Sequence, residues 1–174
     1  PKRMLFTGVG KTEDEIKLAL ENDVLVIKAE SFQEIERINE IAGSMNKKAP
    51  LAIRVNPDVD PLTHPYISTG LTENKFGIDA VQAFDIFKES AGLSNIDLHG
   101  IDMHIGSQIT SVALYVESVL KVTELIKKLT TDGIDIKHYD LGGGMGISYN
   151  DEQTFTPDVI AKIGVGAAGR YGRN

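Results

Sequence analysis

The feature that most constrains the fold is a regular alternation between short β-branched runs and longer segments of helical periodicity. The runs that suit β-strands are Met4–Thr7, Val24–Ala29, Leu51–Asn56, Ile96–Ile105 and Ile136–Leu141. Between them, apolar residues recur at spacings of three and four, which is typical of helices with one buried face. Alternating strands and helices indicate right-handed βαβ units around a parallel sheet.

A parallel sheet of this kind either stays open and doubly wound or closes into a (βα)8 barrel. A barrel needs eight strands and typically ~250 residues, whereas this chain has five candidate strands in 174 residues. The sequence therefore predicts an α/β protein that is either an open five-stranded domain or part of a barrel. The spacing of the elements leaves both possibilities open.

Start signals for four helices stand where the periodic segments begin. Three are capping-box pairs, the last of them in a weaker form: Thr12 with Glu15, Ser31 with Glu34, and Asp79 with Gln82. The fourth is Ser111, which precedes the longest helical segment. We expect a helix to begin directly after each of these caps.

Composition excludes several classes of protein. The net charge is −7, from 18 Lys and Arg against 25 Asp and Glu, so binding to a nucleic-acid backbone is not expected. The chain has no cysteine, which excludes disulfides and thiolate metal sites. No apolar run approaches the roughly 20 residues of a membrane span, and residues 1–8 lack the apolar stretch of a secretory signal. We expect a cytoplasmic protein that does not bind membranes.

The stretch GVGKT, residues 8–12, suggests a nucleotide-binding loop. A P-loop needs a glycine five residues before its Gly-Lys pair, and that position is occupied by Leu5. The acidic residues 13–15 that follow repel a triphosphate. We therefore predict a strand-to-helix turn, in which Gly10 supplies backbone freedom and Thr12 caps the helix.

Two clusters at strand ends are better candidates for binding an anion. Gly142, Gly143 and Gly144 follow the last candidate strand and leave the main chain bare, so an anion can approach their N–H groups. His104 lies at the end of the preceding strand and Ser107 just beyond it, at the edge where parallel α/β proteins bind ligands. Together they indicate a phosphorylated aromatic ligand. A turn without a ligand and a structural histidine are the alternatives.

Metal binding is not expected, because the histidines show no recognised ligand spacing. The histidines are His64, His99, His104 and His138. Arg54 raises a separate question, since it lies in an otherwise apolar strand and needs an anion or hydrogen-bond acceptors. A structural ion pair and a ligand contact both remain open for Arg54.

Two segments lack periodicity. Residues 57–78 contain three prolines and form a connection of a length that is typical of functional or disordered loops. Residues 164–174 contain four glycines and no apolar repeat. We expect residues 1–163 to form the domain, and 164–174 to be an irregular tail that is not native to it.

Five segments, in chain order, resemble the diaminopimelate decarboxylase family. They read FTGVGKTEDEI, LAIRVNPDVDPLTHPYISTG, NKFGI, MHIGSQI and YDLGGGMGISY. The family belongs to the pyridoxal 5'-phosphate (PLP) enzymes built on an alanine-racemase-like barrel, with ornithine and arginine decarboxylases as relatives. The resemblance covers about residues 3–157, and THPYISTG and HIGSQI favour the diaminopimelate branch. It implies a partial (βα)8 TIM-type barrel of about five consecutive βα units.

The resemblance also implies roles for individual residues. His104 is expected to stack on the PLP ring, and Ser107 to lie near its phosphate. The glycines at 142–144 are expected to offer N–H groups to that phosphate, with Gly144 foremost and Arg54 in support. No catalytic residue and no metal ligand is expected in this chain, since the family's PLP-binding lysine belongs to a Tyr-Ala-x-Lys motif upstream of the first matched segment.

The family reaction is the decarboxylation of meso-diaminopimelate to L-lysine and CO2, a step of lysine biosynthesis in which PLP accepts the electrons. The family's Glu-x-Gly-Arg motif and C-terminal β-domain are absent from this sequence. The resemblance therefore implies a central barrel fragment that is inactive alone, and a homodimer in the full-length form. An ornithine- or arginine-type PLP decarboxylase and a non-catalytic phosphate-binding module are the alternatives.

Overall fold

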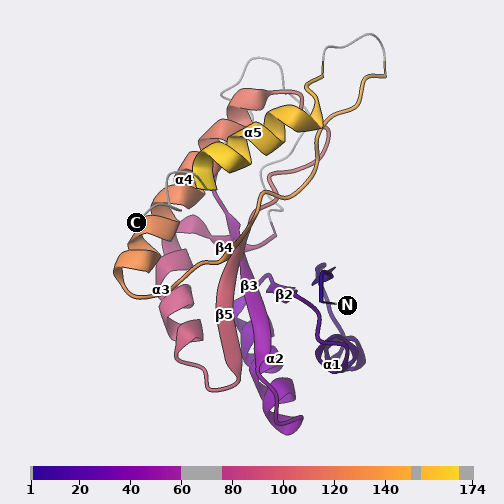
Figure 1. The fold of residues 1–174 in the computed structure, drawn as a ribbon, viewed down its shortest axis with the longest axis vertical. Coiled ribbons are helices and arrows are strands. Elements are labelled where there is room, and N and C mark those ends of the chain that lie inside the picture. Colours follow the sequence, from indigo (N-terminus) through magenta and orange to yellow (C-terminus); the bar gives the residue numbers. More distant parts are fainter. Residues whose placement is uncertain (1, 60–75, 150–153, 169–174) are drawn as a thin grey trace.

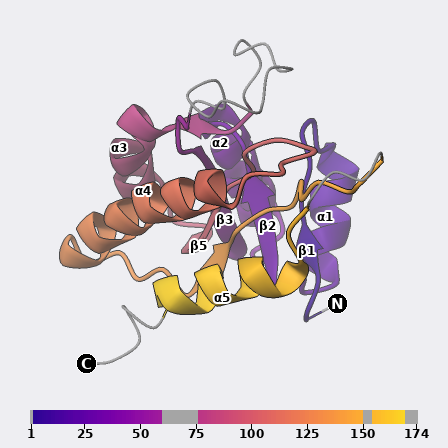
Figure 2. The same cartoon turned by 90° about the horizontal axis from the view of Figure 1, so that it is seen from above.

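Parallel strands form a curved sheet with helices around it (Figures 1 and 2). The computed structural model describes residues 2–59, 76–149 and 154–168. The strands are β1 Leu5–Phe6, β2 Val26–Ala29, β3 Ala49–Asn56, β4 Ile78–Asp79, β5 Ile96–Asp102 and β6 His138–Asp140. The helices are α1 Glu13–Glu21, α2 Phe32–Ser44, α3 Ala80–Ala91, α4 Val112–Thr131 and α5 Pro157–Ala168.

The order of the strands decides between an open sheet and a barrel. All neighbouring strands pair in parallel, in the order β1-β2-β3-β5-β6, and the short β4 pairs with β3 off this path. Apart from β4, the order follows the chain, as it does in a (βα)8 barrel. In a doubly wound sheet the order instead reverses at a switch point. The predicted partial barrel is therefore confirmed, and the open sheet is wrong.

Several predicted boundaries differ from the observed ones. β5 ends at Asp102 instead of Ile105, although the N–H of Met103 still bonds the carbonyl of Asp140 at 3.0 Å. β4 and α5 were not predicted. Residues 164–168 of the predicted irregular tail form the end of α5, where Gly164 allows close packing on Leu141. Residues 169–174, and residues 60–75 of the predicted long loop, lie outside the described residues.

The predicted helix caps are confirmed in part. Thr12 and Glu15 form a complete capping box, and α1 begins at Glu13. The hydroxyl of Ser31 accepts the backbone N–H of Glu34. The return bond of a capping box is missing, because the Glu34 carboxylate accepts from Lys11 and from the N–H of Glu30 instead. The other two predicted caps mark the right positions: Asp79 accepts from the N–H of Val81, and Ser111 precedes α4 without a side-chain bond.

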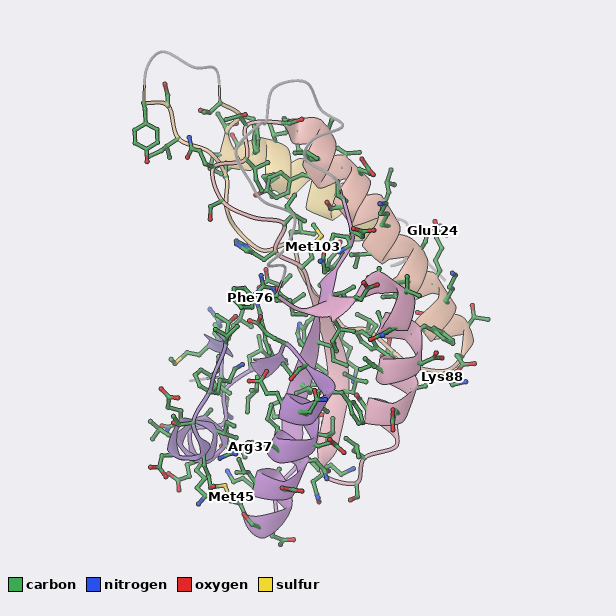
Figure 3. All side chains as sticks on the ribbon, turned by 180° about the vertical axis from the view of Figure 1, so that it is seen from behind. Arg37, Met45, Phe76, Lys88, Met103 and Glu124 are labelled. Carbon is green, nitrogen blue, oxygen red and sulfur yellow. The ribbon has the colours of Figure 1, made fainter. Side chains whose placement is uncertain are left out.

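The strands alternate between two faces, as β-geometry requires. Leu51, Ile53 and Val55 of β3 join the hydrophobic core under the helices, so Ala52 and Arg54 face the concave side of the sheet. Met103 is fully buried below the helical layer (Figure 3). The labelled charged residues of α2, α3 and α4 are solvent-exposed: Arg37, Lys88 and Glu124.

The last helix lies on the other side of the strands from α2 (Figure 2). α5 packs against α4, and its Gly164 lines a cavity of about 820 Å³ together with the concave-side residues Leu5, Lys28 and Ala52. Within the described parts of the chain, none of the helices has the length and apolarity needed to cross a membrane.

Candidate functional site

Charged side chains gather on the concave face near the carboxyl ends of the strands. β2 contributes Lys28, β3 contributes Arg54, β5 contributes Asp102 and β6 contributes Asp140. Asp102 is in register with both Arg54 and Asp140 on its two neighbouring strands. Because parallel strands end at one edge of a sheet, these groups meet at the edge where barrels bind their ligands.

Lys28 is the centre of this charged group. Its Nζ lies 2.8 Å from Oδ1 of Asp102 and 2.6 Å from Oδ2 of Asp140, and the side chains of Lys28 and Asp102 are 7% and 4% exposed. Burial alone lowers the pKa of Lys28, but the hydrogen bonds and charges of the two carboxylates outweigh it and raise that pKa. Lys28 is therefore a protonated amine.

Asp102 is affected by burial in the opposite direction. Desolvation raises the pKa of its carboxyl to about 6, although the hydrogen bond and charge of Lys28 oppose the shift. Lys28, Asp102 and Asp140 were not predicted from the sequence. For Lys28 a signal was available, because it is a charged residue near the end of a short apolar strand, as Arg54 is.

The structure shows one of the two roles that the sequence left open for Arg54, the structural ion pair. Its Nη1 group donates to Oε2 of Glu30 at 2.8 Å, which is the structural ion pair. Its guanidinium lies 5.9 Å from the centre of the Phe76 ring. Among the described residues, its buried Nε has no hydrogen-bond partner. Glu30 thus holds the guanidinium through Nη1, and the buried Nε–H is the donor that remains without a partner among the described residues.

His104 and the glycine turn meet at the same rim. The N–H of Gly143 points at Nδ1 of His104, with 3.3 Å between the nitrogens. Burial, followed by the positive charge of Arg54, lowers the pKa of His104, so its imidazole is neutral at pH 7. An Nδ1 that accepts a hydrogen bond places the ring proton on Nε2. The two clusters that the sequence predicted to cooperate are in contact.

Side chains from two elements, β6 and α4, anchor the glycine turn. Oδ1 of Asp140 accepts the N–H of Gly142 at 2.8 Å. The hydroxyl of Tyr115, a buried residue of α4, donates to the carbonyl of Gly143 at 2.5 Å. Burial raises the pKa of Tyr115, so this hydroxyl remains a donor. The turn is therefore held in one conformation before any ligand binds.

Hydrogen bonds join the loop after His104 to the glycine turn and to the residues that follow it. The amide of Gln108 donates to the carbonyl of Ile147 at 2.6 Å and accepts from its N–H at 3.2 Å. The N–H of Ile109 donates to the carbonyl of Gly144 at 2.8 Å. Gly144 has a φ of +87°, and a Cβ on it would overlap the carbonyl oxygen of Gly106. Only glycine fits this junction.

A cavity of about 640 Å³ opens between these groups. Of the residues predicted to hold the cofactor, it is lined by His104, Gly142, Gly143 and Arg54, and also by Lys28, Glu30, Asp102 and Asp140. The exposed Ser107 and the half-buried Gly144 lie beside this lining in the adjoining loops. The structure therefore brings four of the six predicted residues to one cavity.

Lys11 of the GVGKT stretch serves the protein's own structure. Its Nζ donates to the carbonyl of Gly8 at 2.6 Å and to Oε1 of Glu34 at 2.9 Å, and its side chain is 2% exposed. Gly10 has a φ of +68°, as the predicted turn requires. The lysine that a P-loop would aim at phosphate here ties the turn to α2.

We expect Lys11→Met to lower the free energy of unfolding by about 2 kcal/mol, because it leaves the Glu34 carboxylate and the Gly8 carbonyl without their donor. Urea denaturation followed by circular dichroism measures this change. The control is Lys17→Met, which removes an exposed ion pair with Glu13 and should leave stability near the wild-type value. A stable Lys11→Met protein that loses affinity for ATP contradicts the structural role.

The three histidines that the structure describes do not come together in one group. His99 and His138 are in edge-to-face contact, with ring centres 5.2 Å apart. His104 instead belongs to the rim of the cavity, and His64 lies outside the described residues. In the ranges that the structure describes, no group of three or more His, Cys, Asp or Glu side chains is arranged to hold a metal ion.

Comparisons with known proteins agree with the geometry. Residues 1–165 match the family described as pyridoxal-dependent decarboxylase, pyridoxal binding domain. Diaminopimelate decarboxylase of Vibrio cholerae serotype O1 is 46% identical over 162 residues, 93% of this chain and 39% of that protein. The crystal structure of diaminopimelate decarboxylase from Helicobacter pylori complexed with L-lysine has a TM-score of 0.87 and 39% identity, covering 98% of this chain and 43% of that one.

A more distant structure shows the fold alone. Lysine/ornithine decarboxylase from Vibrio vulnificus, complexed with putrescine, has a TM-score of 0.71 at 22% identity and covers 95% of this chain and 40% of that one. The chain spans about two fifths of the length of its Vibrio cholerae relative. The matches confirm the resemblance seen in the sequence motifs, and the cofactor of the matched domain is PLP. This chain belongs to the pyridoxal-binding domain family of the pyridoxal-dependent decarboxylases.

Proposed function

We propose that this chain is the part of a diaminopimelate decarboxylase that holds the phosphate and one ring face of PLP while meso-diaminopimelate is converted to L-lysine and CO2. The observation that carries the proposal is the contact between His104 and the N–H of Gly143 at the rim of the 640 Å³ cavity. A flat neutral imidazole beside a bare main-chain turn suits a ligand that has both an aromatic ring and a phosphate.

Three features of the rim fit this cofactor. A Cβ at Gly143 would meet nothing within 4 Å, so the space beside its main chain is open to a phosphate. The unpartnered Nε of Arg54 offers a charged donor to an anion. The imidazole of His104 carries no charge at pH 7, which favours stacking on an aromatic ring. In this proposal Ser107 and Gly144 support the phosphate from the adjoining loops.

The chain's own groups then have distinct tasks. Bound PLP supplies the electron sink for the electrons released as CO2 leaves. In this proposal His104 covers one ring face, and Arg54 balances the charge of a phosphate that lies in the open space beside Gly143. Lys28 does not serve as the amine that binds the cofactor covalently, because its protonated Nζ is held by two carboxylates.

The choice of substrate rests on sequence similarity. Identity to diaminopimelate decarboxylase of Vibrio cholerae is 46%, against 22% to the solved lysine/ornithine decarboxylase. We therefore propose meso-diaminopimelate rather than ornithine, lysine or arginine as the substrate, and a homodimer for the full-length enzyme. Turnover of each amino acid by the full-length protein tests the substrate, and sedimentation tests the dimer.

Calorimetric titration of the 174-residue chain with PLP and with inorganic phosphate tests the site itself. We expect His104→Ala to weaken PLP binding by about tenfold, which corresponds to a lost ring contact of ~1.4 kcal/mol. Its phosphate affinity should stay at the wild-type level, since the imidazole faces the ring and not the phosphate. An unchanged PLP affinity in His104→Ala overturns the proposed ring contact and favours a simple phosphate-binding module.

A further inference from the structure

Lys28 connects strands that are not neighbours. It lies on β2, where its register partner on β3 is the small residue Ala52. Its carboxylate partners lie beyond β3, on β5 and β6. Asp102 and Asp140 stand opposite each other in register, so their side chains leave the sheet on the same face. The lysine thus crosses the concave face above β3 and binds both carboxylates.

Each carboxylate is connected to one half of the proposed cofactor grip, which consists of His104 and the glycine turn at residues 142–144. Asp140 uses Oδ2 for Lys28 and Oδ1 for the N–H of Gly142, at 2.6 and 2.8 Å. Asp102 precedes His104 by two residues, and the intervening Met103 bonds the carbonyl of Asp140. Through these contacts the ammonium of Lys28 is coupled to the glycine turn on one side and to the backbone that carries His104 on the other.

The halves of the grip have little freedom to shift independently. Gly142 has a φ of +73°, and a Cβ on it would overlap the carbonyl of Met103 and approach the Cα of His104 to 3.0 Å. Without a cation between them, two adjacent carboxylates repel each other. Separation of Asp102 and Asp140 therefore moves the turn away from the imidazole.

We propose that Lys28 is a positioning residue, which holds the Asp102 and Asp140 carboxylates together and thereby sets the distance between His104 and the glycine turn. The inference rests on the proposed function, because it assigns Lys28 an effect on the affinity for PLP. It goes beyond that function in giving a role to a buried charge that does not contact the reacting atoms.

The test compares Lys28→Met with Lys28→Arg in the 174-residue chain. Lys28→Met keeps the length of the side chain and removes its charge, so PLP should bind about tenfold more weakly or worse, the scale on which groups that orient binding residues from behind act in other sites. Lys28→Arg restores the charge and should recover part of the affinity. Lys17→Met, on the exposed face of α1, is the matched control and should bind PLP as the wild type does.

A readout that needs no cofactor separates positioning from general destabilisation. Amide hydrogen exchange measured by NMR should accelerate at Gly142 in Lys28→Met, because Asp140 no longer holds that N–H in place. Exchange in the buried middle of α2, at Ile38, should stay slow. Fast exchange at both amides indicates loss of the whole fold, whereas wild-type exchange at Gly142 contradicts the positioning role of Lys28.

A second variant covers the case in which Lys28→Met does not fold. The double change Lys28→Met with Asp102→Asn removes the cation together with one buried carboxylate, so no excess buried charge is created. Its Gly142 amide should still exchange faster than in the wild type, since Asp140 remains without its cation. Wild-type exchange at Gly142 in this variant overturns the proposal.

The outcomes also separate this inference from the proposed function. If the wild-type chain binds no PLP, the proposed function of the isolated chain fails, and the exchange rate at Gly142 still decides the role of Lys28. If the wild type binds PLP and Lys28→Met binds it within twofold of that affinity, the positioning role is wrong and the proposed function stands.

Discussion

Gly144→Ala is expected to destabilise the protein by more than about 4 kcal/mol and to abolish binding of PLP and phosphate. The added Cβ would overlap the carbonyl oxygen of Gly106 and lie 2.8 Å from its carbonyl carbon, and the φ of +87° is strained for any other residue. Both contacts are with backbone, so no rotamer change relieves them. The two loops of the site must separate, which breaks the 2.8 Å bond from Ile109 to Gly144.

The neighbouring glycine supplies the matched control. Gly143→Ala places its Cβ in open space, and the φ of Gly143 lies outside the left-handed region. We expect this variant to unfold at the urea concentration of the wild type. Its phosphate affinity should nevertheless fall by about tenfold, because the methyl group enters the space proposed for the anion. Equal stability of the two variants contradicts the tight packing between the loops.

The second large effect is expected in the pH dependence of stability when Asp102 becomes asparagine. Asp102 has a pKa of about 6 in the folded protein and 3.8 as its ordinary value. Between these pH values the folded protein binds more protons than the unfolded chain, so stability falls as pH rises. The contribution of Asp102 is fully present below pH 3.8 and is lost as pH passes about 6.

The asparagine side chain in Asp102→Asn has no such titration, so the variant should gain on the wild type as pH rises. A shift from 3.8 to about 6 corresponds to about 3 kcal/mol, at 1.36 kcal/mol per pH unit. Urea denaturation of both proteins at pH 3.5 and pH 7 measures this change, and the difference between the proteins removes the contributions of other groups. Parallel pH profiles would show that Asp102 ionises as readily in the folded protein as in the unfolded one.

The fold class followed from local pattern, but the closure of the sheet did not. Periodicities of two and 3.6 residues located five of the six strands and four of the five helices that the structure describes. They carry no information on which strands are neighbours, so an open sheet and a barrel are equally compatible with the pattern. The unpredicted α5 contains Gly164 and Gly166, which weaken a helical pattern in isolation. Packing against α4 and Leu141 stabilises that helix in the folded protein.

The site was predictable where chemistry is local. A triple glycine after a strand and a histidine at a strand end are candidates for binding positions that local sequence makes visible, and the structure places His104 and Gly143 in contact. Lys28, Asp102 and Asp140 were not singled out, whereas Arg54 was noticed because its apolar neighbours made it conspicuous. The same reasoning applies to Lys28, which lies in the apolar run Val24–Ala29.

The sequence by itself determined the α/β alternation, the caps of the helices and the residue types of the proposed cofactor grip. These depend on φ/ψ preferences and side-chain periods that act over a few residues. Only the tertiary structure decided that Lys28 bonds Asp102 and Asp140, which lie 74 and 112 residues further along the chain. Burial of a charge becomes favourable only when its partners are brought beside it, and that requires strands in a fixed order.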